Sequence, residues 1–453
     1  LRRVLRSDGT VWLNLGDSYF GDSPVRVKPA DAWSKRWDPS QTRSRGGNRR
    51  SAAQTNGLKP KDLVGMPWAV AVALRADGWW LRSDIIWAKP NPMPESVTDR
   101  PAKAHEHVFL LMGDGENQEG QAYEMMNYAA KHKLGNLILF VDYNQVQLTD
   151  SLANIMPLQV KKHYEAAGWH VQEVDGHDFA AMALAISAAM AETERPSVLI
   201  GHTIMGEGVE FMAKTGREHK ADWHGKSPKK EETEAALAEI ELTVEEAAIL
   251  AEGLKALKVN IKTPHQPDVA AVNTGVAKTY AADVMTDCRG AYGAALLDLA
   301  TLNPHVVALT ADLADSVKTD GVKKNFPERH IECGIAEQHM VSNSGGLSLR
   351  GLVPFCSTFG AFMSSRAKDQ ARVNDINQTN VKMVATHCGL SVGEDGPTHQ
   401  AIDDISSFAG FFHTQIFEPA DPNQCDRIIR YIGATYGNFY VRMWRANIPG
   451  LTK

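Results

Sequence analysis

The chain has 453 residues, a net charge of −6 at pH 7, and 43% hydrophobic residues. This length exceeds what one hydrophobic core usually serves, so we expect two or three domains. The negative net charge excludes a general attraction to nucleic acids or membrane surfaces. No apolar run is long enough to span a bilayer, and the best candidate, residues 179–190, predicts a buried helix.

The cysteine content indicates the cellular compartment. The five cysteines are odd in number, show no CxxC spacing, and are absent from the first 287 residues. The first residues also lack the apolar segment of a signal peptide. Together these observations predict a reduced, cytoplasmic protein without a disulfide framework.

Residues 26–61 carry ten Lys or Arg side chains against two Asp, although the chain as a whole is acidic. Trp33 and Trp37 lie in this stretch, so it suits contact with the phosphates and bases of a nucleic acid. The same stretch is rich in Gly, Ser, Asn and Gln, which also fits a solvated loop without packed structure. Composition leaves both interpretations open.

Between residues 106 and 205, short apolar runs alternate with helical patterns. The runs suit strands buried on both faces, and the alternation predicts a parallel sheet with crossover helices. The predicted strands are 107–112, 136–142, 170–174 and 196–201, and the predicted helices are 119–133, 157–168 and 179–192.

A charged, helical stretch at 229–257 and a predicted linker at 258–285 come next. The alternation then resumes from residue 286 to residue 445, which predicts a second parallel α/β unit of similar size. Its predicted strands are 306–312, 330–335, 353–358, 381–387, 415–420 and 438–444.

Two polar segments, MGDGENQEG at 112–120 and DYNQV at 142–146, each follow a predicted strand. If the two strands are neighbours, Asp114 and Asn144 emerge at the same carboxyl edge of the sheet, where open α/β folds bind ligands. Their oxygens and the backbone carbonyl of Val146 suit Mg²⁺ or Ca²⁺, with a diphosphate completing the coordination. Gly113 and Gly115 allow the backbone to turn tightly and approach an anion.

The GDG sequence, followed after thirty residues by an Asn beyond an apolar strand, resembles the thiamine diphosphate signature. The resemblance implies that this cofactor, with Mg²⁺ or Ca²⁺, is bound by Gly113, Asp114, Gly115, Glu119, Asn144 and Val146. Glu119 matches an acidic contact at the subunit interface, although a first-turn glutamate that stabilises the helix dipole would look the same.

GIAEQHM at 334–340 resembles the transketolase segment that carries the glutamate for the cofactor's aminopyrimidine ring. The resemblance gives that role to Glu337, which shares a proton with the ring nitrogen and so promotes deprotonation of the thiazolium carbon. Phe359 and Phe362, spaced as one face of a helix turn, match aromatics that pack the ring. Asp312 matches a further position near the cofactor. A helix-start glutamate and simple core packing are the alternatives.

HCGLSVGEDGPTHQ at 387–400 also resembles transketolase. The resemblance implies that His399 and Asp395 bind the hydroxyls of the donor sugar, and that His224, in ADWHG, reaches the diphosphate and the substrate. A charge-assisted clamp on a sugar phosphate has a physical reason, because it orients the substrate far from the reacting carbon. The matching phosphate contacts are Arg289, Ser316, His387 and Arg445.

Residues 1–111 resemble a DNA amino-methyltransferase, through DGTVWLNLGDSY near the start and the stretch 63–111. They lack the (D/S/N)PP(Y/F/W) motif and the FxGxG turn of such enzymes, so we do not expect methyl transfer by this chain. A residual DNA-contacting surface remains an alternative function, and an inactive fusion of two fragments is another.

The predicted organisation is an α/β chain with two parallel-sheet units that bind thiamine diphosphate, preceded by a partial α/β methyltransferase-like segment. The segment covers 1–111, the diphosphate unit 112–257, the linker 258–285 and the pyrimidine unit 286–453. The transketolase resemblance implies transfer of a two-carbon ketol unit between sugar phosphates in the pentose phosphate pathway. It also implies a homodimer, and Glu337, His399 and His224 as catalytic residues.

Overall fold

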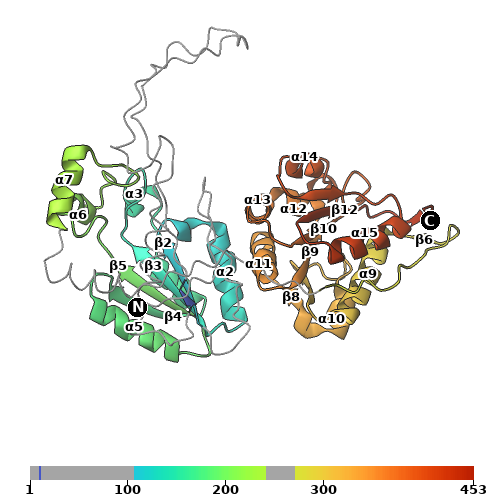
Figure 1. Cartoon of the computed structure of the whole chain (residues 1–453), viewed down its shortest axis with the longest axis horizontal. Helices are drawn as coiled ribbons and strands as arrows, with labels where there is room; N and C mark the ends of the chain where they lie inside the picture. The colour runs from blue at the N-terminus through green and yellow to red at the C-terminus, as the bar shows by residue number, and fades with distance from the viewer. Residues whose placement is uncertain (1–9, 12–106, 241–270, 453) are drawn as a thin grey trace, which may run out of the picture. The chain divides into compact units, whose positions relative to one another are not determined.

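The structure is a computed structural model that describes residues 10–11, 107–240 and 271–452. The described residues form two α/β domains, each built on its own sheet (Figure 1). Most of the predicted methyltransferase-like segment, including the basic stretch 26–61, lies outside the described residues.

The first sheet has five parallel strands in the order β1-β2-β3-β5-β4. The four strands predicted between residues 106 and 205 are all present, and Thr10–Val11 adds a short edge strand beside β2. The strands are β1 (Thr10–Val11), β2 (Val108–Gly113), β3 (Leu137–Tyr143), β4 (His170–Asp175) and β5 (Ser197–His202).

Helices cover both faces of this sheet. Met125 of α2 and Tyr164 of α4 pack in one core cluster with the strands, while Ile186 of α5 packs in a second cluster on the other face. The helical elements are η3 (Glu116–Gln118), α2 (Gly120–Lys131), α3 (Leu152–Ile155), α4 (Val160–Ala166), α5 (Phe179–Ala191), α6 (Glu210–Arg217) and α7 (Lys230–Glu239).

Helix α5 forms where the apolar run predicted it, but the expectation that it is buried is wrong. Its N-cap Asp178 accepts from the backbone N–H groups of Ala180 and Ala181, which fixes its start. Ile186 is buried against the sheet, whereas Phe179 is 82% exposed. A sheet covers only one side of a helix, and the run is apolar on every side, so the opposite face is left open.

The second sheet has six parallel strands in the order β11-β12-β10-β9-β7-β8. All six strands predicted from residue 306 onward are present. They are β7 (Val306–Thr310), β8 (His330–Glu332), β9 (Val353–Phe359), β10 (Lys382–Thr386), β11 (Gln415–Phe417) and β12 (Phe439–Arg442). A separate antiparallel pair joins β6 (Met285–Thr286) to β13 (Ile448–Pro449).

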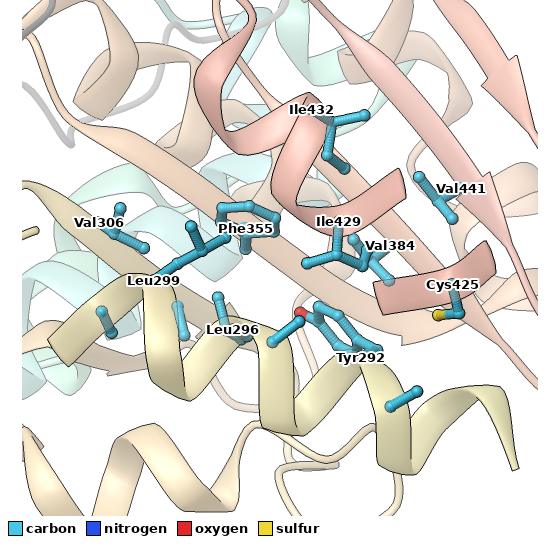
Figure 2. Close-up of a cluster of buried hydrophobic side chains, with 14 of the residues drawn as sticks. Tyr292, Leu296, Leu299, Val306, Phe355, Val384, Cys425, Ile429, Ile432 and Val441 are labelled. Atoms are coloured by element: carbon cyan, nitrogen blue, oxygen red, sulfur yellow. The ribbon is translucent and has the colours of Figure 1, made fainter. Parts of the chain in front are cut away.

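Two core clusters hold helices on the two faces of the second sheet. Figure 2 shows one of them, in which Leu296 of α9 points toward Phe355 of β9 and Ile429 of α15. Met340 of α11 lies in the other cluster with Met383 of β10. The helical elements are α9 (Cys288–Leu302), α10 (Asp320–Asn325), η4 (Pro327–Arg329), α11 (Glu337–Leu349), α12 (Gly360–Ser365), α13 (Lys368–Ile376), η5 (Pro397–His399), α14 (Asp404–Phe408) and α15 (Pro422–Ala434).

The segment before β6, which falls in the predicted linker, lies against the second domain from residue 271 onward. The backbone N–H of Asn273 donates to Asn303 Oδ1 at 2.7 Å, and that of Tyr280 donates to Asn423 Oδ1 at 2.6 Å. These contacts fix its path over α9 and α15.

Two further expectations concern the cysteines and the membrane-spanning helices. All five cysteines, which lie in the described residues, are free and buried. Across residues 107–240 and 271–452, no helix is long and apolar enough to cross a membrane.

Candidate functional site

The carboxyl edge of the first sheet places the two predicted metal ligands after neighbouring strands. Strands β2 and β3 are parallel, with Gly113 opposite Asp142. The backbone N–H of Asp114 donates to the carbonyl of Asp142 at 3.1 Å, so the pairing continues one residue past β2. Asp114 and Asn144 therefore leave the sheet side by side, as the sequence predicted.

The loop after β3 bends back over Asp114. Asp114 Oδ2 accepts from the backbone N–H of Gln145 at 2.5 Å, and Asn144 Oδ1 accepts from that of Val146 at 2.8 Å. Gln145 adopts a left-handed conformation with φ of 61°, and its carbonyl accepts from the N–H of Leu152 at 2.9 Å. These hydrogen bonds hold three groups close together at the end of the two strands: the Asp114 carboxylate, the Asn144 amide oxygen and the Val146 backbone.

Burial raises the pKa of Asp114 to about 6. The N–H of Gln145 opposes this shift, and the nearby Asp142 adds to it. A divalent cation would offset the cost of burying the ionised carboxylate. The carboxylate of Asp114, the amide oxygen of Asn144 and the Val146 carbonyl are mixed oxygen donors, which would suit Mg²⁺. Across the described residues no group of three or more His, Cys, Asp or Glu side chains could hold a metal ion.

The GDG turn itself is held rigid. The N–H of Gly113 donates to Glu116 Oε2 at 2.7 Å, and the carbonyl of Gly113 accepts from Asn117 Nδ2 at 2.9 Å. A Cβ added at Gly115 would lie 3.4 Å from Gln147 Nε2. That Nε2 is buried and donates no hydrogen bond to any of the described residues. A rigid glycine turn next to an amide donor without an acceptor would suit the binding of a diphosphate group.

A histidine that the sequence analysis did not select lies at this edge. His219 Nδ1 is 3.4 Å from the carbonyl oxygen of Asn144, and His219 is close enough to lower the pKa of Asp114. His219 follows α6 in a left-handed conformation, with φ of 53°. No spacing rule in the sequence marks it, because its position depends on how α6 ends.

The predicted His224 is exposed, in a turn whose Gly225 lies beside Leu148 of the loop after β3. The structure thus brings this turn to the same edge, although no hydrogen bond joins His224 to Asp114. Glu119, the predicted interface residue, is the N-cap of α2 and makes no side-chain capping bond.

The carboxyl edge of the second sheet carries the predicted pyrimidine and substrate residues. Glu337 begins α11 and is 3% exposed. Its Oε1 accepts from Arg366 Nη1 at 2.7 Å, and the Arg366 guanidinium lies 3.9 Å over the ring of Phe362. Arg366 was not selected from the sequence, although its position four residues after Phe362 is a helical spacing that places the two side chains together.

Four aromatic rings gather beside this ion pair. The rings of Phe359 and Phe362 stack with centroids 5.6 Å apart, and His387 lies 4.0 Å from Phe359. His399 lies 5.1 Å from Phe362. The expected geometry needs one correction: Phe359 is the last residue of β9 and only caps α12, so the two rings do not share a helix face. They meet because the chain turns from strand to helix between them.

The predicted phosphate contacts lie next to these rings. Arg289 Nη1 is 3.3 Å from His387 Nε2 and also donates to the carbonyl of Ser316 at 3.3 Å. Arg289 Nη2 donates to Asp287 Oδ2 at 2.5 Å, while its buried Nε has no hydrogen-bond partner among residues 107–240 and 271–452. One cluster therefore forms around the Arg289 guanidinium, which contacts Ser316 and His387 and can still donate one more hydrogen bond.

His387 is buried, and its pKa is lowered to about 4. Burial is the largest cause, followed by the positive charges of Arg289 and Arg445, and Asp395 opposes the shift. His387 is therefore neutral near pH 7, and it would serve a phosphate as a hydrogen-bond donor rather than as a cation.

Arg445 and Asp395 border the same cluster. Arg445 Nη1 donates to the carbonyl of Val392 at 2.6 Å and lies 3.4 Å from Asp395 Oδ2, while Nη2 donates to Glu394 at 2.8 Å. Asp312 follows β7 with an exposed side chain, and its N–H donates to Glu332 Oε1 at 2.7 Å. All of these residues lie at the carboxyl edge of one sheet.

Three family models match parts of the chain. Residues 96–268 match the transketolase thiamine diphosphate binding domain, and residues 285–450 match the transketolase pyrimidine binding domain. Residues 1–178 also match a DNA methylase family, overlapping the first domain.

Individual transketolases and their solved structures are also similar to the chain. The chain is 34% identical to human transketolase over 354 residues, covering 76% of this chain and 53% of that protein. It is 33% identical to bovine transketolase-like protein 1 over 345 residues, covering 76% and 56%. A transketolase structure from Campylobacter jejuni aligns with a TM-score of 0.59 at 25% identity, covering 77% of this chain and 57% of that one.

The fold is also shared with a Pichia stipitis transketolase solved in complex with xylulose 5-phosphate. That structure has a TM-score of 0.60 at 23% identity and covers 76% of this chain and 57% of its own. The chain thus spans about half the length of the curated relatives that it matches. Residues 96–268 and 285–450 belong to the transketolase family, as its thiamine diphosphate binding domain and its pyrimidine binding domain.

Proposed function

We propose that the chain binds thiamine diphosphate with Mg²⁺ and transfers a two-carbon ketol unit from a ketose phosphate to an aldose phosphate. One observation carries the proposal: each sheet gathers a separate part of the required chemistry at its carboxyl edge. Asp114 and Asn144 follow neighbouring strands of the first sheet, while Arg289, His387 and the Phe359–Phe362 pair meet at the edge of the second.

In the diphosphate domain, Asp114, Asn144 and the Val146 carbonyl would hold the metal ion. Gly113 and Gly115 would let the backbone approach the diphosphate closely. The bonds from the Gln145 and Val146 N–H groups preset the two side chains, which lowers the cost of ordering them on binding. His219 and the turn that carries His224 border this site.

In the pyrimidine domain, Glu337 would hold a proton against the nitrogen of the cofactor's aminopyrimidine ring, and Phe359 and Phe362 would pack that ring. Thiamine diphosphate, when bound, supplies the carbon nucleophile that carries the ketol unit. Glu337 is suited to its part because it is buried and fixed at the start of α11. Its partner Arg366 is 45% exposed at the side chain, so it has room to adjust when the ring enters.

The substrate would lie between the phosphate cluster and the aromatic pair. Arg289, the neutral His387 and Arg445 would bind the phosphate, and the carbonyl contact from Arg289 places Ser316 beside them. His399 and Asp395 would orient the donor hydroxyls nearer the rings. A clamp on the phosphate holds the reacting carbon in place without contacting it.

We infer that the active form is a homodimer, in which the diphosphate domain of one protomer and the pyrimidine domain of its partner would complete each site. Exposed apolar side chains at the carboxyl edge of the second sheet support this arrangement, because Ile335, Leu390 and Ile402 are each more than 70% exposed beside the site. The five buried free thiols support a reducing, cytoplasmic setting.

Calorimetric titration tests the proposal at its base. We expect thiamine diphosphate to bind with Mg²⁺ present and to bind at least about tenfold more weakly with a chelator. Turnover is then measured with xylulose 5-phosphate as donor and an aldose phosphate as acceptor. Binding without turnover would limit the function to cofactor binding and favour an inactive fusion. Failure to bind with Mg²⁺ would overturn the proposal.

A second candidate function is contact with DNA, which the match of residues 1–178 to a DNA methylase family favours. The basic stretch 26–61 supplies the charge for it. We expect binding of the full chain to duplex DNA to weaken steeply between 50 and 200 mM salt, roughly a thousandfold for six or more phosphate contacts. Binding that does not respond to salt, or no binding at 50 mM, would refute this function.

A further inference from the structure

The amide group of Gln147 lies at the diphosphate site, and the family resemblance gives it no role. Its Nε2 is buried and has no hydrogen-bond partner within the part of the chain that the structure describes. An amide N–H₂ normally donates to an oxygen when buried, because an unused donor loses its bonds to water without replacement. A retained donor of this kind indicates an acceptor that joins on binding.

The backbone holds this amide in place. The N–H of Gln147 donates to the carbonyl of Asp150 at 2.9 Å, and its neighbour Val146 forms a β-bridge with Ser151. The loop therefore closes on itself just after Asn144. The side chain then runs along Gly115, with Cγ, Cδ and Nε2 all between 3.4 and 3.8 Å from the position of an added Cβ there.

The position of the amide indicates what it would bind. It lies against the glycine that follows Asp114, so a group bound to a metal held by Asp114 would lie next to it. Asp114 and Asp142 already make this edge negative, and a neutral donor adds a hydrogen bond without altering the charge that holds the metal. Of the acceptors expected here, a phosphate oxygen of the diphosphate is the strongest.

We propose that Gln147 is a further cofactor-binding residue, whose Nε2 donates a hydrogen bond to a phosphate oxygen of the bound diphosphate. The inference rests on the proposed function, because it needs a diphosphate at the GDG turn. It adds a contact from the loop after β3 to those from Gly113 and Gly115. In the cofactor-free protein the same amide is a cost to stability.

Removing this amide should therefore have two opposite effects: it should weaken cofactor binding and stabilise the cofactor-free protein. Gln147→Met keeps the length of the side chain and removes the donor. We expect the affinity for thiamine diphosphate with Mg²⁺, measured by calorimetry, to fall about tenfold, since hydrogen bonds to charged acceptors are the stronger class. The melting temperature of the cofactor-free protein should rise by about 2 °C, because the unused buried donor is gone.

Gln172→Met is the matched control. Gln172 lies on β4, and its Nε2 donates to the carbonyl of Ala185 at 3.0 Å, so its amide is satisfied within the protein. We expect this variant to lower the melting temperature and to leave the cofactor affinity unchanged. Inorganic pyrophosphate with Mg²⁺ serves as a second probe. It carries the diphosphate without the rings, so Gln147→Met should weaken its binding by the same factor.

The outcomes distinguish a failure of the inference on Gln147 from a failure of the proposed function. If the wild-type chain binds thiamine diphosphate and Gln147→Met binds it equally well, the inference is overturned and the proposed function stands. If affinity and melting temperature both fall in Gln147→Met, the residue is structural and the inference is again overturned. If the wild-type chain binds neither thiamine diphosphate nor pyrophosphate, the proposed function and the inference fail together.

Discussion

Three polar residues that follow strands adopt backbone conformations that L-residues rarely take. Gln145 after β3, Asp312 after β7 and His387 after β10 have φ of 61°, 60° and 56°. The left-handed region is costly for residues with a Cβ, and such strain persists where the surrounding structure fixes it. All three lie at the carboxyl edges where ligand-binding residues gather, so the strain coincides with the candidate site.

Asp114→Asn tests the buried carboxylate. The pKa of Asp114 is about 6 in the folded protein, above its ordinary value of 3.8. The stability from the neutral carboxyl is therefore present below about pH 4 and lost as the pH rises through 6. In cofactor-free protein we expect Asp114→Asn to raise the melting temperature at pH 7 but to change it little at pH 4.

The same variant should bind thiamine diphosphate and Mg²⁺ at least about tenfold more weakly than wild type, because an amide is a poorer ligand than a carboxylate. Thermal melts at both pH values and one titration series measure the two effects. A variant that is destabilised at pH 7, or that binds the cofactor as well as wild type does, would contradict the role given to Asp114.

The lowered pKa of His387 predicts that the protein loses stability as the pH falls, which is opposite to the effect expected from Asp114. Its pKa is about 4 in the folded protein, below the ordinary value of 6.5. Unfolding therefore takes up a proton between these values, and the stability from the neutral ring is lost as the pH falls from 6.5 through 4. We expect His387→Asn to reduce this fall in the free energy of unfolding, measured by urea titration at pH 7 and pH 5.

His339 is the internal reference for that experiment. Burial lowers its pKa to about 3, so it adds its own acid dependence to wild type and variant alike. The His387→Asn protein should thus remain acid-sensitive but with a shallower slope. An identical slope in the two proteins would mean that His387 takes its proton in the folded state.

At the scale of elements, helix α11 depends on a glycine that helix propensity alone would disfavour. A Cβ added at Gly345 would lie 2.0 Å from Asn374 Oδ1 on α13. Asn374 is buried, and its Nδ2 donates to the carbonyl of Val341 at 2.8 Å, so the side chain is not free to move away. Close approach of α11 and α13 therefore requires the missing side chain.

We expect Gly345→Ala to lower the free energy of unfolding by about 1–3 kcal/mol, the usual cost of overpacking. Helix propensity acts in the other direction by about 1 kcal/mol and does not compensate. Gly321→Ala in α10 is the control, since its nearest neighbour would be Leu297 Cδ2 at an ordinary 3.6 Å. Urea unfolding of both variants measures the difference, and a Gly345→Ala protein as stable as wild type would show that the helices separate easily.

At the scale of the whole molecule, the proposed dimer predicts complementation between two inactive variants. Asp114→Asn damages the diphosphate domain, and Glu337→Gln damages the pyrimidine domain. If each site uses one domain from each protomer, a mixed dimer contains one intact site. Equal mixing with random exchange should restore about a quarter of the sites.

The readout is exchange of the proton on the thiazolium carbon of the bound cofactor, followed by nuclear magnetic resonance. Each variant alone should exchange at least about tenfold more slowly than wild type. Sedimentation at the same concentrations checks that the mixture is dimeric. No recovery in a dimeric mixture would indicate that both halves of each site come from one chain.

The order of strands and helices was readable from the sequence, because a strand buried on both faces is apolar throughout and its crossover helix follows a different period. The adjacency of Asp114 and Asn144 followed from the same pattern, since consecutive parallel strands bring their carboxyl ends to one edge. Arg289 lies beside His387, as the phosphate role implied for both residues would require. Glu337 begins α11, a position that fits both the cofactor role and the helix-start alternative.

Other features were decided only by contacts between distant segments. The pairing of Arg366 with Glu337, the approach of His219 to Asn144 and the packing of residues 271–285 on α9 and α15 join side chains and backbone far apart in the chain. The open face of α5 is similar, because an evenly apolar helix does not indicate which side meets the sheet. Local periodicity reports burial along one element, whereas the partner of a charge or a ring depends on where other elements bring their side chains.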